Sequence, residues 1–451
     1  MAAAGGGSGL LVGIDVGTTM CKAAVVDLDG VERSQGRWRT PWRHEGDETE
    51  CDPGDLLDAA LRAARAALDG APPGPLVALG VTSMAESGVL LSEDGEPLLP
   101  VIAWHDPRGK DEAERIAVTL GHDATVRRTG VPPSPKHSFA KLLWMRHHRP
   151  ESKRAYKFLS VAEWVVHSLG GRARAEASLA SRTGWLDVAA GHWWGEALYA
   201  FGIERALLPE IERAGAPWGE TGDALGRGRG AVLTVAGHDH LCAAVGAGAV
   251  ADGDVLDSCG TAEAFVKATA GLPDVERCVS GGVTVGRHVL ADRFALLGGL
   301  RSGLLLERCF RTLGVEGDEA RTTLDDQALA LGPTAPGLLA DLLPIIEKGG
   351  AVPPSVIAGR FRRAALDHVV SRGADLLGVI EGAAGRTSRL IATGGGTRSR
   401  AFMALKEAAL GPLLVPQVAE AGARGAALLA GCAAGIFPDP WSVPVPGMKP
   451  R

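Results

Sequence analysis

The chain has 451 residues, a formal net charge of −6 and a hydrophobic fraction of 46%. At about 100–200 residues per domain, this length predicts two or three domains, and the composition is that of a globular chain rather than a disordered or fibrous one. The slightly acidic balance lacks the basic footprint that is typical of nucleic-acid binding.

Cysteine usage and the N-terminal segment indicate the cellular compartment. The seven cysteines are widely spaced and form no CxxC pair, so neither a disulfide framework nor a zinc site is expected, and a reducing cytoplasm is favoured. The start, MAAAGGGSG, lacks the basic and apolar regions of a signal peptide, and no run of about 18 apolar residues follows it. We therefore expect a cytoplasmic protein without a membrane partner.

The first apolar run, LLVGIDVGTTMCKAAVVDLDG, predicts two strands joined by a tight turn. Residues 10–14 form the first strand, which leads into Asp15. Gly17 supplies the turn, and residues 23–26 resume an apolar strand. The run therefore indicates a strand–turn–strand unit with an acidic residue at the end of its first strand.

A helix and further strands follow this unit. An apolar stripe at helical spacing begins at Gly54, and Asp52 is placed as its N-cap, followed by a proline at the first helical position. The next segment predicts a strand to Val81, a second at 88–91 and a third ending near Trp104. Strands with an intervening helix indicate an α/β sheet.

A second segment, GDVLDSCGTAEAFVKA, repeats the first pattern. An apolar strand reaches Asp257, a turn passes through Gly260 and Thr261, and a β-like segment leaves it. One alternative is that Asp-x-Gly-Thr is simply a common hairpin. Two copies of one unit favour instead a duplicated architecture, with one unit in each domain.

A third landmark is RLIATGGGTRSRAFMALKEAAL. A strand ends at Thr393, the glycines Gly394, Gly395 and Gly396 follow, and a helix opens around Ser399. Glycines at a helix N-terminus let a ligand approach the backbone at the positive end of the helix dipole. The later AGARGAALLAGCAAG predicts a small-residue helix that packs closely on its neighbours.

The two Gly-Thr turns are suited to a phosphate chain, because a tight turn directs successive N–H groups and hydroxyls at one point. Thr18, Thr19 and Thr261 supply hydroxyls and Lys22 supplies a cation. Asp15 is placed to hold magnesium, which takes few carboxylates and keeps several waters. A P-loop is excluded, since GxxxxGK[ST] is absent, and GxGxxG fails at the first strand.

Together these motifs resemble the FGGY carbohydrate kinases, within the superfamily of sugar kinases, actin and heat-shock chaperones. GIDVGTTMCKAAVVD and DVLDSCGTAEAF resemble the two phosphate motifs, and ATGGGTRSRAFMALKEAALGPLLV resembles the adenosine motif. SMAESGVLLSEDGEPLLPVIAWHDPRG, KLLWMRHHRPE and VAGHDHLCAAVGAGAV resemble stretches specific to FGGY kinases. The motifs run in family order from Leu10 to Phe437.

The resemblance implies an α/β fold of two actin-like (ribonuclease H-like) domains with a nucleotide and sugar cleft between them. The N-terminal domain, for sugar and phosphate, spans 9–247, and the C-terminal domain, for adenosine, spans 248–440. Asp15 would hold Mg²⁺. ATP would be bound by Gly17, Thr18, Thr19, Lys22, Gly260, Thr261, Gly394, Gly395, Gly396 and Ser399.

The resemblance also makes Asp239 the catalytic base, in contact with the substrate. A hydroxyl that attacks a γ-phosphoryl group needs a carboxylate to accept its proton and align it. Asp239 follows the apolar strand AVLTVAG and precedes an Ala-rich helix, so it should sit at a strand end facing the cleft. The alternative is that Asp239 only caps that helix.

Three residues are assigned to the sugar. Glu86 falls where glycerol kinases place a glutamate that binds hydroxyls, although the usual Gln-x-His-Gly of the family is absent here; the alternative is a surface-loop glutamate. Trp104 would form an apolar wall, and Asp106 would accept a further hydroxyl. The alternatives for these two are a core tryptophan and a structural Asp106–Arg108 pair.

The sequence thus predicts ATP-dependent phosphorylation of a hydroxyl of a small sugar or polyol, with a pentose, a hexulose and a short polyol all open. Thr397, where the family commonly has alanine, should be tolerated. Two alternatives are an ATP-switched binding protein and an inactive, sugar-sensing relative. The expected partners are the sugar or polyol and ATP, without nucleic acid or membrane, and a homodimer is left open.

Overall fold

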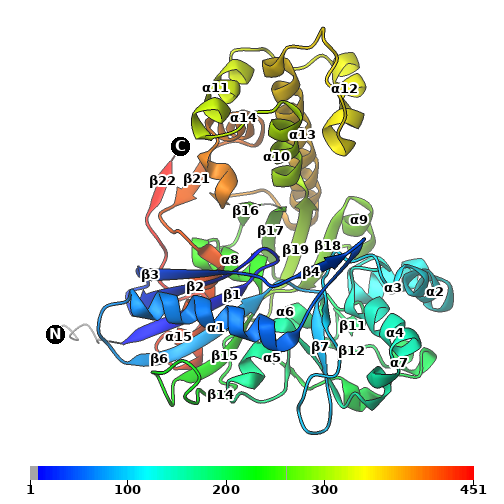
Figure 1. Ribbon diagram of the computed structural model, residues 1–451, viewed down its shortest axis with the longest axis vertical. Helices are drawn as coiled ribbons and strands as arrows, with labels where there is room; N and C mark the ends of the chain where they lie inside the picture. The colour runs from blue at the N-terminus through cyan, green and yellow to red at the C-terminus, as the bar shows by residue number, and fades with distance from the viewer. Residues whose placement is uncertain (1–8, 261, 451) are drawn as a thin grey trace.

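The computed structural model describes residues 9–260 and 262–450, so the expected phosphate ligand Thr261 lies outside the described residues. Two mixed β-sheets form the framework. In Figure 1 the N-terminal sheet lies in the lower half, and helices α10 to α14 lie above the second sheet. The α/β class that the sequence predicts is confirmed.

Helices and strands occur throughout the described part of the chain. Those of the N-terminal half are β1 (Leu10–Val16), β2 (Met20–Asp27), β3 (Glu32–Arg39), β4 (Arg43–Glu45), β5 (Glu48–Cys51), α1 (Pro53–Asp69), β6 (Leu76–Ser83), β7 (Gly88–Leu91), β8 (Val101–Ile102), α2 (Lys110–Leu120), α3 (His122–Thr129), α4 (Ser138–His148), η1 (Pro150–Arg154), β9 (Lys157–Ser160), α5 (Val161–Ser168), β10 (Ala175–Glu176), α6 (Ala177–Ala180), β11 (Leu186–Asp187), β12 (His192–Trp193), α7 (Gly195–Ala200), η2 (Arg205–Leu207), β13 (Ile211–Glu212), β14 (Gly219–Glu220), β15 (Val232–His238) and α8 (Asp239–Ala247). Those of the C-terminal half are β16 (Asp254–Cys259), β17 (Glu263–Thr269), α9 (Val275–Ser280), β18 (Val283–Arg287), β19 (Phe294–Leu300), α10 (Ser302–Thr312), α11 (Asp318–Leu329), α12 (Pro336–Lys348), α13 (Ala358–Ala384), β20 (Arg389–Thr393), η3 (Gly395–Arg398), α14 (Arg400–Leu410), β21 (Leu413–Pro416), α15 (Ala421–Ala433) and β22 (Met448–Pro450).

The two sheets share one pattern of connections. In the first, of order β14-β15-β6-β1-β2-β3, β1 pairs antiparallel with β2 and parallel with β6. In the second, of order β18-β19-β17-β16-β20-β21-β22, β16 pairs antiparallel with β17 and parallel with β20. The predicted duplication of the strand–turn–strand unit is therefore present in the topology.

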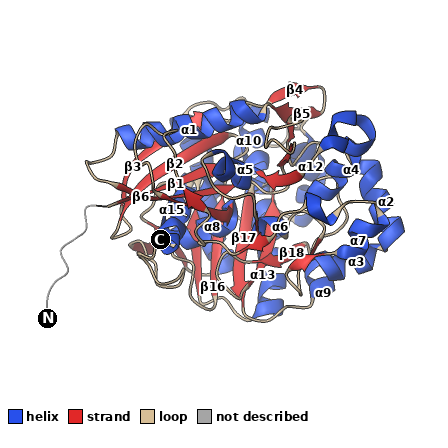
Figure 2. Ribbon diagram, turned by 90° about the horizontal axis from the view of Figure 1, so that it is seen from below, coloured by secondary structure: helices blue, strands red, loops and turns tan. Residues whose placement is uncertain are grey.

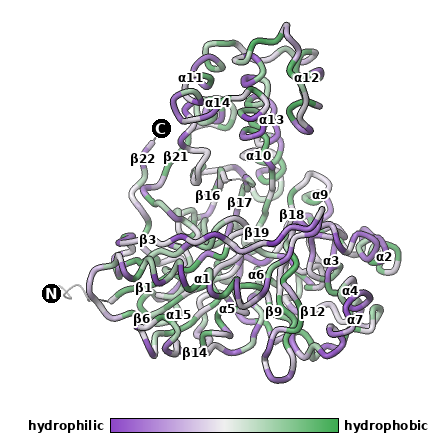
Figure 3. Tube along the Cα trace, in the orientation of Figure 1, coloured by the Kyte–Doolittle hydropathy of each residue, from purple (hydrophilic) through white to green (hydrophobic). Residues whose placement is uncertain are grey.

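Local signals in the sequence set several element boundaries. The Asp52 carboxylate accepts hydrogen bonds from the N–H groups of Gly54 and Asp55, so α1 begins where its cap predicts. Strand β3 is the edge strand of its sheet, and its mostly hydrophilic residues appear purple in Figure 3. Charged side chains on an edge strand discourage pairing with another chain.

Helix α15 packs against the N-terminal sheet at backbone distance. A Cβ added at Gly13 of β1 would lie 1.8 Å from the carbonyl oxygen of Ala423, and one added at Gly425 would lie 1.9 Å from that of Cys242 in α8. Only glycine allows these approaches, and the close packing expected of this helix is confirmed. Because α15 lies between β21 and β22 of the second sheet in sequence, the C-terminal part of the chain completes the core of the first sheet. The boundary at 247/248 stays a prediction.

Helices α2, α3, α4 and α7 form a group beside the N-terminal sheet (Figures 1 and 2). This group is joined to the second sheet at strand β18, where the N–H of Val285 donates to the carbonyl of Gly130 at 2.9 Å. Within the described part of the chain, no helix is both long and apolar enough to cross a membrane.

Candidate active site

Two carboxyl groups lie at the same edge of the N-terminal sheet. Asp15 is the penultimate residue of β1, and Asp239 directly follows β15. Strands β1, β6 and β15 are parallel neighbours, and ligands in such sheets bind beyond the carboxyl ends of the strands. Both predicted residues are therefore brought to one end of the sheet.

Burial and mutual repulsion change the acidity of these groups. Burial, followed by the charge of Asp239, raises the pKa of Asp15 to about 7. Burial raises the pKa of Asp239 to about 7 as well; the N–H of His240 opposes this shift and the charge of Glu86 adds to it. A carboxylate with a pKa near neutrality is well matched to accept a proton at physiological pH.

The alternative of Asp239 as a helix cap is wrong. The N-cap of α8 is His238, and Asp239 is already the first helical residue. Its Oδ1 accepts the N–H of His240 at 2.7 Å and lies 3.2 Å from Nε2 of His238. The carboxylate thus stays at the strand end without closing the first turn of the helix.

The buried carboxylate of Glu176 stabilises the end of strand β15 through a chain of hydrogen bonds. Oε2 of Glu176 accepts the hydroxyl of Ser178 at 2.6 Å and the N–H groups of Ser178 and Leu179. The Ser178 hydroxyl in turn accepts the N–H of His238 at 3.0 Å. Burial raises the pKa of Glu176 to about 7.

The first Gly-Thr turn is a closed hairpin. The Gly17 N–H donates to the carbonyl of Met20, and the Gly17 carbonyl accepts the Thr40 hydroxyl at 2.7 Å. Oγ1 of Thr18 accepts the indole N–H of Trp104 at 2.8 Å. The turn that is expected to bind phosphate and the tryptophan that is expected to bind sugar are therefore direct neighbours.

The predicted cation Lys22 lies opposite Asp15 in the hairpin register. Its ammonium pairs with Glu420 at 2.8 Å, and its charge lowers the pKa of Asp15 against the effect of burial. Thr19, one residue before strand β2, is exposed. Glu420, which precedes α15, thus ties the C-terminal helix to the first turn.

The triple-glycine loop packs on the second turn. A Cβ at Gly394 would lie 2.8 Å from the carbonyl oxygen of Cys259, and one at Gly396 would lie 2.9 Å from its Cβ; Gly260 is the next residue, and Gly395 opens η3. Ser399 caps α14, as expected, by accepting the N–H of Phe402. Its hydroxyl donates to Asp325.

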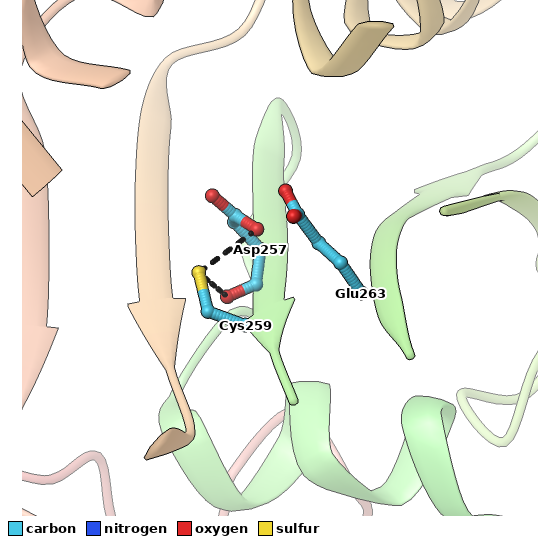
Figure 4. A group of neighbouring side chains, drawn as sticks. All are labelled: Asp257, Cys259 and Glu263. Atoms are coloured by element: carbon cyan, nitrogen blue, oxygen red, sulfur yellow. Dashed lines mark hydrogen bonds between the residues drawn. The ribbon is translucent and has the colours of Figure 1, made fainter. Parts of the chain in front are cut away.

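Asp257, Cys259 and Glu263 form a buried cluster beside this turn (Figure 4). The ammonium of Lys406 pairs with both carboxylates, with Glu263 at 2.5 Å, and all three charged side chains are fully buried. Burial opposes the charge of Lys406, but the neighbouring anionic groups raise its pKa. The Lys406 ammonium thus balances the negative charge of the two carboxylates, and a metal ion is not needed there.

Glu86 is not a surface residue, and one of its two carboxylate oxygens is already paired. Nε and Nη2 of Arg182 both donate to its Oε1, at 2.9 and 2.7 Å, and both side chains are largely buried. Burial opposes the charge of Glu86, but Arg182 and His137 outweigh it and hold its pKa below the usual value. A φ of 65° keeps this loop residue in the left-handed region, which is strained for glutamate.

The expectation that Asp106 accepts a substrate hydroxyl is corrected. Its carboxylate takes two side-chain bonds and one backbone bond from Arg108 and the N–H of Thr49. An ionised carboxylate has about four acceptor sites, so none is left for a sugar. The alternative of a structural Asp106–Arg108 pair is the one that the structure supports.

The comparisons with known proteins agree with this geometry. Residues 10–246 match the family described as FGGY family of carbohydrate kinases, N-terminal domain. The chain is 31% identical to a glycerol kinase of Trichlorobacter lovleyi over 461 residues, covering 95% of this chain and 91% of that one. A xylulose kinase from Rhodospirillum rubrum has the same fold, with a TM-score of 0.84, 22% identity and coverage of 98% and 93%. A gluconate kinase from Lactobacillus acidophilus has a TM-score of 0.84 and 20% identity, covering 98% and 92%.

The two-domain actin-like fold and these relatives define an ATP-dependent carbohydrate kinase. The chain belongs to the FGGY family.

Sequence reasoning missed four residues of the site: Glu176, Ser178, Arg182 and Lys406. Glu176 bonds to the nearby Ser178, and the other three act on residues distant in sequence, such as Arg182 on Glu86, 96 residues away. The sequence motifs do not indicate these hydrogen bonds and ion pairs, because they depend on tertiary contacts.

Proposed function

We propose that this kinase transfers the γ-phosphoryl group of ATP to a hydroxyl of a small sugar or polyol, with Asp239 as the base. The observation that carries the proposal is the pair of half-buried carboxyls, Asp15 and Asp239, at the end of the N-terminal sheet beside the first Gly-Thr turn. The pKa of Asp239, near 7, suits the transfer of a hydroxyl proton at neutral pH.

The nucleotide lies between the two turns in this proposal. Backbone and hydroxyl groups of Gly17, Thr18 and Thr19 hold phosphate oxygens from one side, and Gly260 and Thr261 do so from the other. The adenosine lies against Gly394 to Gly396 and the N-terminus of α14, which Ser399 caps. Lys22 adds a positive charge, which Glu420 keeps at the turn.

Asp15 fits a magnesium ion. Its Oδ1 is buried and has no hydrogen-bond partner within the described residues, and burial, together with repulsion from Asp239, raises its pKa. A divalent cation would satisfy the unpartnered oxygen and favour the ionised form. When bound, Mg²⁺ neutralises charge on the phosphates.

The sugar lies between Asp239, the half-buried face of Trp104 and the remaining oxygen of Glu86. Oε2 of Glu86 has no hydrogen bond from the described residues and can accept a hydroxyl, while Arg182 fixes the carboxylate in place. The glycerol, xylulose and gluconate kinases among the relatives make polyols, keto-sugars and sugar acids the substrates to test. Action in the cytoplasm on free small molecules and assembly as a homodimer also belong to the proposal.

A panel of sugars, polyols and sugar acids tests the proposed kinase activity, with ADP formation and phosphorylated product measured together. Equal amounts of ADP and phosphorylated product with at least one acceptor are expected. ATP binding without any phosphorylated product would favour an ATP-switched binding protein, and sugar binding without turnover would favour an inactive sensor.

A further inference from the structure

Lys136 places a positive charge on the sugar side of the site. Its Nζ lies 5.7 Å from the ring centroid of Trp104, whose indole N–H is bonded to Thr18 in the first turn. Within the described residues no carboxylate lies at ion-pair distance from Lys136. A cation is therefore held beside the reaction site without a protein counter-ion.

The loop that carries Lys136 is rigidly attached. The buried ammonium of Lys141 donates to the carbonyls of Trp104, Pro135 and Lys136, at 3.2, 2.5 and 3.1 Å. These bonds tie the backbone at Lys136 to the backbone at Trp104. The backbone at Lys136 is thus fixed beside Trp104, and the exposed side chain extends from it over the indole ring.

The charges around Lys136 leave a positive excess. The negative charge of Glu86 is compensated by Arg182, and burial together with Arg301 and Arg182 lowers the pKa of Lys136 against the effect of Glu86. Arg301 directly follows β19, whose last residue pairs with Glu263 beside the second turn. Arg301 also has no ion pair within the described residues, so Lys136 and Arg301 are two uncompensated cations near the sugar side of the site.

We propose that the preferred substrate is a sugar acid, whose carboxylate pairs with Lys136 while a hydroxyl reaches Asp239. This inference rests on the proposed function and specifies its substrate class. A substrate carboxylate would pair with Lys136, whereas a neutral polyol leaves that charge without a partner. The reaction is otherwise unchanged: the hydroxyl oxygen bonds to the γ-phosphorus, the bond from that phosphorus to the bridging β,γ-oxygen breaks, the hydroxyl proton goes to Asp239, and the substrate carboxylate does not react.

Matched pairs of substrates test this assignment. Each pair holds an aldonate and the alditol of equal length, for example glycerate with glycerol, xylonate with xylitol and gluconate with glucitol. For the pair that the enzyme accepts best, kcat/KM should be about 10–100-fold higher for the acid, the gain expected from one charge-assisted hydrogen bond. Lys136→Met should bring the two values together, and Lys136→Arg should retain the preference.

The control is Lys348→Met, which removes an exposed lysine at the end of α12 and should keep the wild-type ratio of acid to alditol. A wild-type preference for alditols or for sugar phosphates would overturn the proposal, as would a Lys136→Met variant with an unchanged ratio. Because Lys136 is exposed, the variant should keep its melting temperature, which is measured alongside. Failure to phosphorylate any acceptor would contradict the proposed function itself, and is thus a separate result.

Discussion

The hydroxyl of Ser178 accepts the backbone N–H of His238 at 3.0 Å, and so fixes the residue directly before Asp239. The same hydroxyl donates to the buried carboxylate of Glu176. The base is thus held by a chain of hydrogen bonds that begins in a segment 60 residues away. This chain makes Ser178 a positioning residue, because it acts on the base through the backbone.

We expect Ser178→Ala to lower kcat while leaving the KM for ATP nearly unchanged. The variant leaves the buried N–H of His238 without its acceptor, at a cost of about 1–3 kcal/mol, and a small displacement of a catalytic group can lower the rate by about 100-fold. Steady-state kinetics measures both constants. Ser168→Ala, whose hydroxyl only bonds a carbonyl in its own helix, is the control; equal kinetics for the two variants would remove the positioning role.

Glu176→Gln should flatten the pH dependence of stability. Burial raises the pKa of Glu176 from its ordinary value of 4.5 to about 7. The folded protein therefore retains a proton that the unfolded chain releases, and stability falls as pH rises from about 4.5 to 7. At about 1.4 kcal/mol per pKa unit, this loss is on the order of 3–4 kcal/mol.

The Glu176→Gln variant can keep the hydrogen bonds of the wild type, because its amide oxygen can take the place of Oε2. All three donors reach Oε2 of Glu176, and Oε1 has no partner within the described residues. Urea unfolding at pH 5 and pH 8 measures the effect. The wild type should lose more stability between these values than the variant does. Parallel pH profiles would show that Glu176 is ionised throughout.

Glu86→Gln should destabilise the protein and lower kcat/KM for the acceptor. The change leaves the largely buried Arg182 without its counter-ion, at a cost of about 1–3 kcal/mol, since one amide oxygen can still accept. Thermal unfolding and acceptor kinetics measure the two effects. In the control, Glu276→Gln breaks the exposed pair with Arg127 and should change stability by about 0–1 kcal/mol. Equal melting temperatures would contradict a structural Glu86–Arg182 pair.

Lys406→Met should destabilise the C-terminal sheet by about 3–5 kcal/mol, the cost of leaving buried carboxylates unpaired. The ammonium compensates Asp257 and Glu263, both fully buried. Urea unfolding gives the free energy, and Lys348→Met at an exposed position is the comparison. If both variants unfold at the same urea concentration, the carboxylates do not depend on Lys406 for compensation.

Local patterns predicted much of the framework. The strand at 88–91 coincides with β7, Asp52 and Ser399 cap the helices that they were expected to open, and the two turns begin equivalent hairpins. These features depend on residues close in sequence, where turn chemistry and capping decide the structure. The small-residue composition of α15 likewise predicted its close packing, because only glycine permits backbone contact.

Contacts between distant segments could not be predicted in this way. Helices α10 to α13 were not predicted, because no motif in their sequence indicates them. Asp106 was expected to bind a hydroxyl, but Thr49 and Arg108 saturate it, and only the folded chain brings Thr49 there. Glu86 lies in the loop between β6 and β7, as expected, yet its partner Arg182 comes from the segment after α6.

The variant Asp239→Asn tests whether Asp239 is the base that takes the hydroxyl proton. The asparagine keeps the size of the side chain but cannot take the hydroxyl proton, so kcat should fall by about 10²–10⁴. A rapid-quench measurement of γ-phosphoryl transfer to the best acceptor, with nucleotide affinity determined separately, isolates this step. We expect slow phosphoryl transfer with unchanged ATP affinity. Phosphoryl transfer at the wild-type rate would show that Asp239 is not the base.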